Sequence, residues 1–222
     1  KMRYLIITKK VWDKNTFKNL KGNFKLSKSL NKAKIYKFNP DIIFFIFWSK
    51  LIPDDIFKKF LCIQFHSSDL PKFRGGSPIQ NQILRGIRKT KITAFKVHKK
   101  LDQGDICLKK KLVLDGNAQT IFFQIEKIVL NMINTLSKRK KIKFYKQTGK
   151  STFYRRRKPE ESEIKFDKFK NLKEIYNFIR STDAEGYPKA FLKFKNFKVD
   201  LYDAKLGINN LNAKIKISKK KK

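Results

Sequence analysis

Three apolar runs in the first third of the chain have the length and composition of β-strands. They cover residues 3–8, 41–48 and 61–66. The middle run is apolar without interruption from Ile42 to Phe47, so a strand here would be apolar on both faces. Such strands belong in parallel sheets that helices cover on each side. The pattern therefore predicts a buried strand at the centre of a layered α/β sheet.

Helical patterns lie between and after these runs. Pro53, followed by two aspartates, marks the start of one short helix, and Ser77, followed by proline, marks another with Ser77 as its N-cap. The clearest amphipathic helix covers residues 118–138. Its apolar face is formed by Ile121, Phe122, Ile125, Ile128, Val129, Met132, Ile133 and Leu136. Two more strands, at residues 91–98 and 106–114, precede this helix, and the alternation predicts an open, mostly parallel α/β sheet flanked by helices.

The pattern changes in the last third of the chain. Residues 147–162 contain a glycine, three consecutive arginines and a Lys-Pro pair, which is typical of a linker. An amphipathic helix around residues 172–179 and two short strands between residues 189 and 201 follow. We therefore predict a main unit over residues 1–146, then a linker and a small C-terminal α+β appendage over residues 147–222.

The chain has 222 residues and a formal net charge of +37. A basic surface binds phosphate backbones, so non-specific contact with nucleic acid is one expectation. However, 46 of the 55 basic residues are lysines, spread along the whole length, whereas specific contacts to phosphates and base edges favour arginine. A lysine-rich composition without functional meaning explains the charge equally well. The final lysines, in residues 218–222, are expected to form a frayed basic tail.

Other compositional features point to a folded cytoplasmic protein. Hydrophobic residues make up 41% of the chain, which is too much for a disordered polypeptide. No apolar run reaches the roughly 18 residues that a membrane span needs, and no export signal is visible. Cys62 and Cys107 lie in apolar stretches without metal-ligand spacing. We therefore expect buried free thiols, no metal site and no contact with a membrane.

Candidate chemistry gathers around the end of the run at residues 61–66. Gln64 and His66 are two residues apart, so on a strand both side chains leave the same face, at the edge where open α/β sheets bind ligands. With Asp102 they would form an acid–base set of amide, imidazole and carboxylate. A half-buried structural role for His66 is equally compatible with the residues alone. Gly75 and Gly76 either bring backbone close to a ligand or make a sharp turn.

A series of motifs in this region matches a known family. They are Phe-His-Ser-Ser-Asp-Leu-Pro-Lys-Phe-Arg-Gly-Gly-Ser-Pro at 65–78, Arg-Gly at 85–86, Ile-Thr at 92–93 and Leu-Asp-Gln-Gly-Asp at 101–105. The series resembles the formyltransferases that use N10-formyltetrahydrofolate as co-substrate. Two further stretches, at residues 74–81 and 179–191, look like the branch that formylates sugar nucleotides. The resemblance covers roughly residues 41–194 and implies a Rossmann-like sheet for the main unit, which would be the catalytic domain.

The resemblance also implies roles for individual residues. The family's catalytic residues are asparagine, histidine and aspartate, and His66 and Asp102 match the last two. Gln64 stands where the family has asparagine, so the amide is kept but one methylene is added, and the effect on activity is open. The apolar and aromatic segment from Phe47 and Trp48 to Ile52 suits the flat pterin of the folate, although plain core packing is the alternative, and Phe47, Trp48, Ile52 and Asp105 are the expected folate contacts. Implied substrate contacts are Arg74, Gly75, Gly76 and Ser77.

The resemblance to the sugar branch implies an N-formyltransferase that acts on the amine of a nucleotide-linked aminosugar. Such an enzyme would serve lipopolysaccharide or glycan biosynthesis, and we expect a homodimer. An enzyme like methionyl-tRNA formyltransferase is the alternative, although about 60 residues after the linker are few for an RNA-binding domain. The Gln64 departure and the lysine content leave a second alternative, a catalytically inactive protein that binds nucleic acid.

Overall fold

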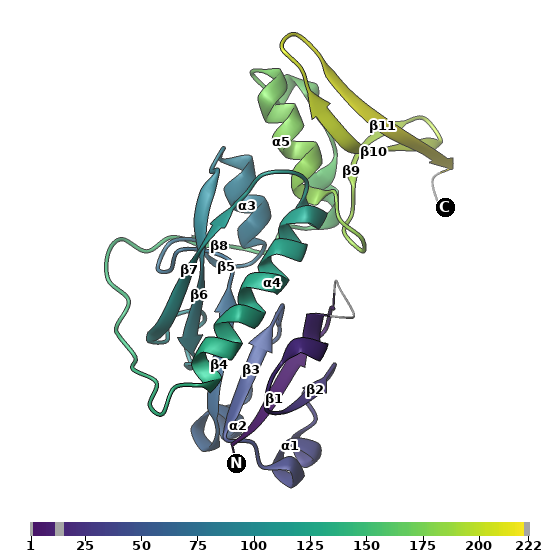
Figure 1. The fold of residues 1–222 in the computed structure, drawn as a ribbon. Coiled ribbons are helices and arrows are strands. Elements are labelled where there is room, and N and C mark those ends of the chain that lie inside the picture. The colour runs from purple at the N-terminus through teal and green to yellow at the C-terminus, as the bar shows by residue number, and fades with distance from the viewer. Residues whose placement is uncertain (1, 12–15, 220–222) are drawn as a thin grey trace.

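A six-stranded sheet forms the centre of the protein, in a computed structural model that describes residues 2–11 and 16–219 (Figure 1). The strands are β1 (Arg3–Thr8), β2 (Asn23–Ser27), β3 (Ile42–Ile46), β4 (Leu61–His66), β6 (Lys89–Lys96) and β7 (Ile106–Val113). Their order is β2-β1-β3-β4-β6-β7. The first four are parallel, and β6 and β7 are antiparallel to their neighbours. The predicted open, mostly parallel sheet is confirmed.

Strand β3 is buried on both faces, as its uninterrupted apolar run predicts. Ile42, Phe44 and Ile46 join the core under α4 (Ala118–Ser137), whereas Ile43 and Phe45 join the core under α1 (Lys32–Phe38) and α2 (Asp54–Lys59). Figure 1 shows α4 crossing one face of the sheet.

Among the described residues, no helix has the length and apolar content needed to cross a membrane.

The sequence pattern did not predict β2 and α1. β2 is an edge strand whose residues are mostly exposed or half-buried, so its apolar signal is weak. In α1 only Ile35 is buried, and the helix is capped by Asn31, whose side chain accepts a hydrogen bond from the Lys34 N–H at 3.0 Å. Both elements are held by capping and edge pairing rather than by a wide apolar face.

The chain after α4 returns to the main unit instead of leaving it. Tyr145 forms an isolated antiparallel bridge with Ile106, and β8 (Phe153–Tyr154) pairs in parallel with β5 (Arg74–Gly75). We call residues 145–157 the crossing segment. Much of the predicted linker therefore packs on the main unit, and the boundary between residues 146 and 147 stays a prediction.

Helix α3 (Pro78–Leu84) begins at Pro78 and Ser77 is its N-cap residue, as predicted, but the Ser77 side chain does not cap the helix. Ser77 has a φ of 48° and its side chain makes no capping bond to the helix. Instead, the Ser77 hydroxyl oxygen accepts a hydrogen bond from the Arg157 N–H at 3.1 Å. The crossing segment thus takes the group that the sequence assigns to the helix N-terminus.

The C-terminal unit is a three-stranded antiparallel sheet with one helix packed against it, which confirms the predicted α+β appendage. Its elements are α5 (Leu172–Thr182), β9 (Ala190–Phe194), β10 (Phe197–Leu206) and β11 (Leu211–Lys219). The described residues also include three short 3-10 helices: η1 (Thr16–Asn19), η2 (Pro159–Ser162) and η3 (Phe166–Lys168). Strand β11 was not predicted, and it includes the first two residues of the expected frayed tail. The remaining residues, 220–222, lie outside the described residues.

Two side chains at the end of α5 join this unit to the main one. Arg180 is buried, and its Nη1 donates to the carbonyl oxygens of Leu114 at 2.7 Å and Gly116 at 2.8 Å. The Asp183 carboxylate accepts hydrogen bonds from the Asn117 side chain at 3.2 Å and from the Asp203 N–H at 2.9 Å. The two units are therefore fixed to each other by buried hydrogen bonds.

Cys62 and Cys107 are buried and free, as expected. Burial raises the pKa of each thiol to about 12. The pKa of an unfolded cysteine is about 8.5, so folding favours the neutral thiol. The thiols therefore contribute stability that is complete below pH of about 8.5 and is lost as the pH rises through about 12.

We predict that neither thiol of the native protein reacts with a chromogenic disulfide reagent at about pH 8, because both are neutral and enclosed. Both should react within minutes once denaturant unfolds the chain. The absorbance of the released thiolate measures the reaction, and the denatured sample serves as the control. Rapid reaction of one or two thiols in the folded protein would contradict the burial described above.

Candidate active site

Gln64 and His66 lie at the end of β4, on the sheet face away from α4. The neighbouring residues Ile63 and Phe65 belong to the core under α4, and Cys62 belongs to the opposite core. The alternation of a strand then assigns Gln64 and His66 to the side of Cys62. The predicted common face of these two polar residues follows directly from this arrangement.

The imidazole of His66 is buried, with 7% of the residue exposed, and its two nitrogens have different neighbours. Nε2 lies 2.6 Å from the carbonyl oxygen of Phe73. A carbonyl can only accept a hydrogen bond, so Nε2 carries hydrogen in this arrangement. Nδ1 faces the Asp102 Oδ2 at 3.7 Å, which is an ion-pair separation but too long for a hydrogen bond. The Phe73 carbonyl orients the ring, and Nδ1 is the nitrogen that can exchange a proton.

The Asp102 carboxylate is held in place by a backbone group. Its Oδ2 accepts a hydrogen bond of 2.8 Å from the Gly75 N–H, and only 4% of the residue is exposed. Asp102 has a φ of 53° in the turn between β6 and β7, a conformation that few residues other than glycine adopt. Among the described residues, no group of three His, Cys, Asp or Glu side chains could hold a metal ion. The tertiary fold thus brings His66 and Asp102 together, 36 positions apart in sequence.

Gln64 reaches toward the loop that follows β3. Its Nε2 donates to the carbonyl oxygen of Trp48 at 3.3 Å. An amide nitrogen has two hydrogens, so the second remains available to another acceptor. The indole N–H of Trp48 is buried and has no hydrogen-bond partner among the described residues. Two donors therefore lie in the same region without a protein acceptor.

The residues implied as folate contacts do not form one group. Trp48 and Ile52 are buried together in the core on the His66 side of the sheet. Phe47 has a φ of 49° and packs on the other side, where its ring meets that of Phe122 edge-on at a centroid distance of 6.0 Å. Asp105 is exposed. The turn at Phe47 separates side chains that the sequence places in one apolar stretch.

The residues implied as substrate contacts are bonded to the rest of the chain. Arg74 binds the side chain of Gln147, and the Gly76 N–H donates to the Tyr154 carbonyl at 2.8 Å. A Cβ atom on Gly75 would lie 2.2 Å from the Tyr154 carbonyl oxygen, and one on Gly76 would lie 2.4 Å from the Arg156 Cα. The two glycines are therefore required by the close approach of the crossing segment, and their role toward a substrate stays a prediction.

Sequence reasoning missed three contributors to this region. The Phe73 carbonyl holds His66, and the Phe73 N–H donates to the Thr152 hydroxyl at 2.8 Å. Gln147 bonds the Asp102 turn to Arg74. A backbone carbonyl has no sequence signal, and Gln147 and Thr152 lie in a stretch without periodic pattern. Nothing in the sequence alone would have selected them.

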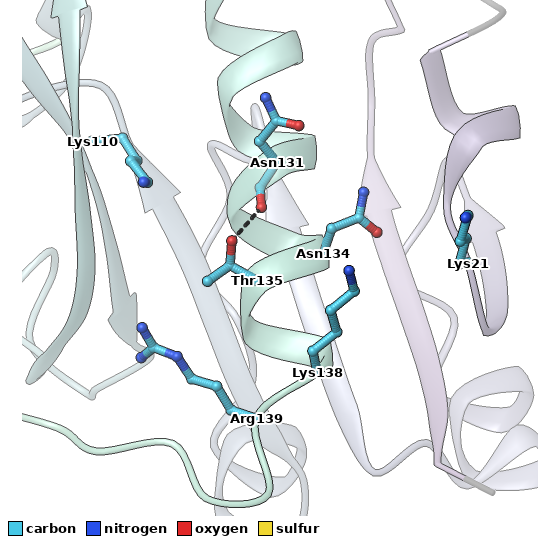
Figure 2. A pocket seen from close by; sticks show the side chains of 7 residues that line it. All are labelled: Lys21, Lys110, Asn131, Asn134, Thr135, Lys138 and Arg139. Atoms are coloured by element: carbon cyan, nitrogen blue, oxygen red, sulfur yellow. Dashed lines mark hydrogen bonds between the residues drawn. The ribbon is translucent and has the colours of Figure 1, made fainter.

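A separate hollow lies on the opposite side of the protein, beside the C-terminal half of α4. It has a volume of about 740 Å³. Its lining residues, drawn in Figure 2, are Lys21, Lys110, Asn131, Asn134, Thr135, Lys138 and Arg139. None of the predicted site residues lines this hollow. Its charged residues are lysines and one arginine, and basic residues occur along the whole chain of net charge +37, so they do not mark the hollow as a binding site. The cluster around His66 and Asp102 contains an imidazole and a carboxylate, the groups that acid–base catalysis requires, and it is the candidate active site.

Comparison with known proteins gives matches over both units. A family model described as "Formyl transferase" matches residues 6–121, and one described as "Methionyl-tRNA formyltransferase, C-terminal domain" matches residues 159–218. The curated methionyl-tRNA formyltransferase of Sulfurihydrogenibium sp. (strain YO3AOP1) is 32% identical over 188 residues, which are 81% of this chain and 59% of that protein. The chain thus spans about three fifths of the length of that curated relative.

Solved structures give the same picture for the fold. A methionyl-tRNA formyltransferase from Clostridium thermocellum is 41% identical, with a TM-score of 0.92 over 99% of this chain and 100% of that one. HypX from Aquifex aeolicus, solved in complex with tetrahydrofolic acid, is 16% identical with a TM-score of 0.74 over 91% of this chain and 38% of that one. A 4-N formyltransferase from Francisella tularensis is 16% identical, with a TM-score of 0.65 over 86% of this chain and 92% of that one.

The expected aminosugar acceptor is therefore wrong. The relatives of 32% and 41% identity are methionyl-tRNA formyltransferases, whereas a solved sugar N-formyltransferase from Shewanella sp FDAARGOS_354 is only 12% identical. Residues 74–81 and 179–191 suggested the sugar branch, but they form the β5 turn and the Arg180 junction. Those features belong to the architecture and say nothing about the acceptor. With the acceptor, the expected place in lipopolysaccharide or glycan biosynthesis also loses its support.

We predict that Gly104→Ala destabilises the protein, because the added Cβ would lie 1.6 Å from the Lys96 carbonyl oxygen. To relieve this clash the backbone of the Asp102 turn must move, which we expect to lower the free energy of unfolding by about 3 kcal/mol. Thermal unfolding should show a melting temperature lower by about 6–12 °C. Gln103→Ala in the same turn, at an exposed residue, is the matched control and should melt like the parent. Equal melting of both variants would contradict the close approach.

Proposed function

We propose that this chain, which belongs to the formyl transferase family, transfers a formyl group from N10-formyltetrahydrofolate to the amine of methionyl-tRNA. The observation that carries the proposal is the 41% identity to the Clostridium thermocellum methionyl-tRNA formyltransferase over nearly the full length of both chains. The match of residues 159–218 to a methionyl-tRNA formyltransferase C-terminal domain supports the same acceptor. The family uses N10-formyltetrahydrofolate, which supports the donor.

The net charge of +37 supports an RNA acceptor. In the small sheet, Lys216 lies opposite Asp200 and Lys214 lies opposite Tyr202, so both lysines project from one face of β11. Lys198, at the next position of that face on β10, pairs with Asp200 at 2.7 Å, and Lys214 pairs with Asp203 at 2.9 Å, so two carboxylates offset part of the positive charge of this face. Composition alone does not assign a function to the high lysine content. Under this proposal, the lysines contribute to the binding of a polyanionic RNA.

The reaction forms a bond between the methionine amine and the formyl carbon and breaks the bond from that carbon to N10 of the folate. The amine loses a proton, and N10 gains one. We assign the amine proton to His66 Nδ1, since Nε2 is bonded to the Phe73 carbonyl. The Asp102 carboxylate, 3.7 Å from Nδ1, stabilises the imidazolium that forms and lets it return the proton to N10.

Negative charge develops on the formyl oxygen during the attack. The free hydrogen of Gln64 Nε2 is the donor that we assign to it, because the other hydrogen is held by the Trp48 carbonyl. The longer side chain of Gln64, compared with asparagine, gives this amide the reach to bond the loop after β3. Buried Trp48, with its unpartnered indole N–H, and Ile52 fit a flat heterocycle that carries hydrogen-bond acceptors.

We predict that His66→Ala and Asp102→Ala each lower kcat at least about 10²-fold, because each removes a group that handles charge in the transition state. Tetrahydrofolate release, followed by absorbance under saturating substrates, measures the effect. His98→Ala is the matched control, since it removes the other histidine of the chain, which is exposed, and it should keep the parental rate. Near-parental turnover of either site variant would remove that residue from the mechanism.

The acceptor is tested by incubating the protein with N10-formyltetrahydrofolate and methionyl initiator tRNA at about 0.15 M salt, where loose surface attraction is screened. We expect formylmethionyl-tRNA, detected after hydrolysis of the ester. Deacylated tRNA should not be formylated, because it lacks the methionine amine. Free methionine should not be formylated either, because it lacks the polyanionic tRNA. No product from methionyl-tRNA, under conditions where the protein is folded, would refute the proposed function.

A further inference from the structure

The side chain of Gln147 makes four hydrogen bonds around the candidate site. Its Nε2 donates to the carbonyl oxygens of Asp102 at 2.8 Å and Gly104 at 2.9 Å. Its Oε1 accepts from Arg74 Nη2 at 2.6 Å and Arg74 Nε at 3.3 Å. These bonds use both hydrogens and both lone pairs of the amide. Gln147 therefore has no remaining capacity for a ligand, and its bonds serve the protein alone.

The bonds form a closed path that includes the Asp102 carboxylate. Gln147 holds Arg74, the next residue Gly75 donates its N–H to Asp102 Oδ2 at 2.8 Å, and the Asp102 carbonyl returns to Gln147. Asp102 has a positive φ of 53°, so its conformation depends on the surrounding contacts. Through this path Gln147 supports the position of the Asp102 carboxylate relative to His66 Nδ1, although Gln147 contacts neither the carboxylate nor the imidazole.

The crossing segment is itself fixed on both sides of Gln147. Two residues earlier, the Tyr145 N–H donates to the Ile106 carbonyl at 2.9 Å, and its carbonyl accepts from the Ile106 N–H at 2.7 Å. Five residues later, the Thr152 hydroxyl accepts from the Phe73 N–H, and the Phe73 carbonyl binds His66. One segment thus contacts the supports of both the imidazole and the carboxylate.

We propose that Gln147 is a positioning residue for formyl transfer, which holds the Asp102 carboxylate opposite His66 by binding the Asp102 and Gly104 carbonyls. The inference rests on the proposed function. A displacement of about 1 Å at a reacting group can cost about 10²-fold in rate. Loss of the two Nε2 bonds is therefore expected to lower the rate of the chemical step and to leave substrate binding intact.

The kinetic test uses Gln147→Ala and Gln147→Glu. Both remove the Nε2 donor, and the glutamate keeps an acceptor for Arg74. Each should lower kcat about 10-fold to 10²-fold, with KM for both substrates within twofold of the parent. Gln103→Ala is the matched control in the same turn and should keep the parental kcat. A parental kcat for Gln147→Ala, or an activity of Gln147→Glu equal to the parent, would overturn the proposal.

A double-variant cycle separates positioning from general weakening of the structure. If Gln147 acts through Asp102, then Gln147→Ala in an Asp102→Ala background should cause no further loss of kcat. Losses that multiply would mean that Gln147 acts independently of Asp102, which overturns the proposal. Thermal unfolding of every variant confirms that the compared proteins are folded.

A spectroscopic test does not need turnover. The chain has two histidines, so the ring nitrogen resonances of His66 can be assigned with His98→Ala. Gln147→Ala should move the His66 resonances in the direction that Asp102→Asn moves them and leave those of His98 in place. Unchanged His66 resonances would overturn the proposal. Failure of the parent to formylate methionyl-tRNA would refute the proposed function alone, because this readout is independent of activity.

Discussion

The pairing of β8 with β5 is the interaction on which the candidate site depends. It lays the crossing segment, residues 145–157, against the loop that supplies backbone groups to the site. The Phe73 carbonyl holds His66, and the Gly75 N–H holds Asp102. Both polar side chains are therefore oriented by main-chain atoms, whose positions follow from strand pairing rather than from a rotamer choice. This is the rigid support that precise geometry at a reactive site requires.

The same pairing explains the two glycines of the Arg-Gly-Gly-Ser-Pro motif. A Cβ on either Gly75 or Gly76 would lie within 2.4 Å of the crossing segment's backbone, so the pairing could not form. In this chain the two glycines of the motif are therefore needed to build the frame, whatever the acceptor. The aminosugar expectation failed for this reason, since it relied on residues that build the frame.

The elements predicted correctly include those with a strong apolar pattern, such as β3, which is buried throughout, and α4, which buries one face. β2 and β11 are edge strands in which no residue is buried, so neither has the uninterrupted apolar run of a central strand. The apolar–polar alternation of β11 is nevertheless a strand pattern, so this strand could have been predicted. In the site, His66 and Asp102 were placed together from strand position and a turn motif. Gln147 and the Phe73 carbonyl could not be predicted, because they act through long-range contacts of a segment without periodicity.

Arg180 and Asp183, at the end of α5, join the C-terminal unit to the main unit that holds the candidate site. Burial of Arg180 lowers the pKa of its guanidinium through desolvation, so an isolated buried charge would be costly here. Its hydrogen bonds to Leu114, Gly116 and Asn177 offset that cost, and Asp183 adds bonds to Asn117 and Asp203. The small sheet is thus held in a fixed relation to the main unit. Under the proposed function, a tRNA acceptor that contacts both units would meet a frame whose geometry is set before binding, and less of its binding energy would be spent on ordering the protein.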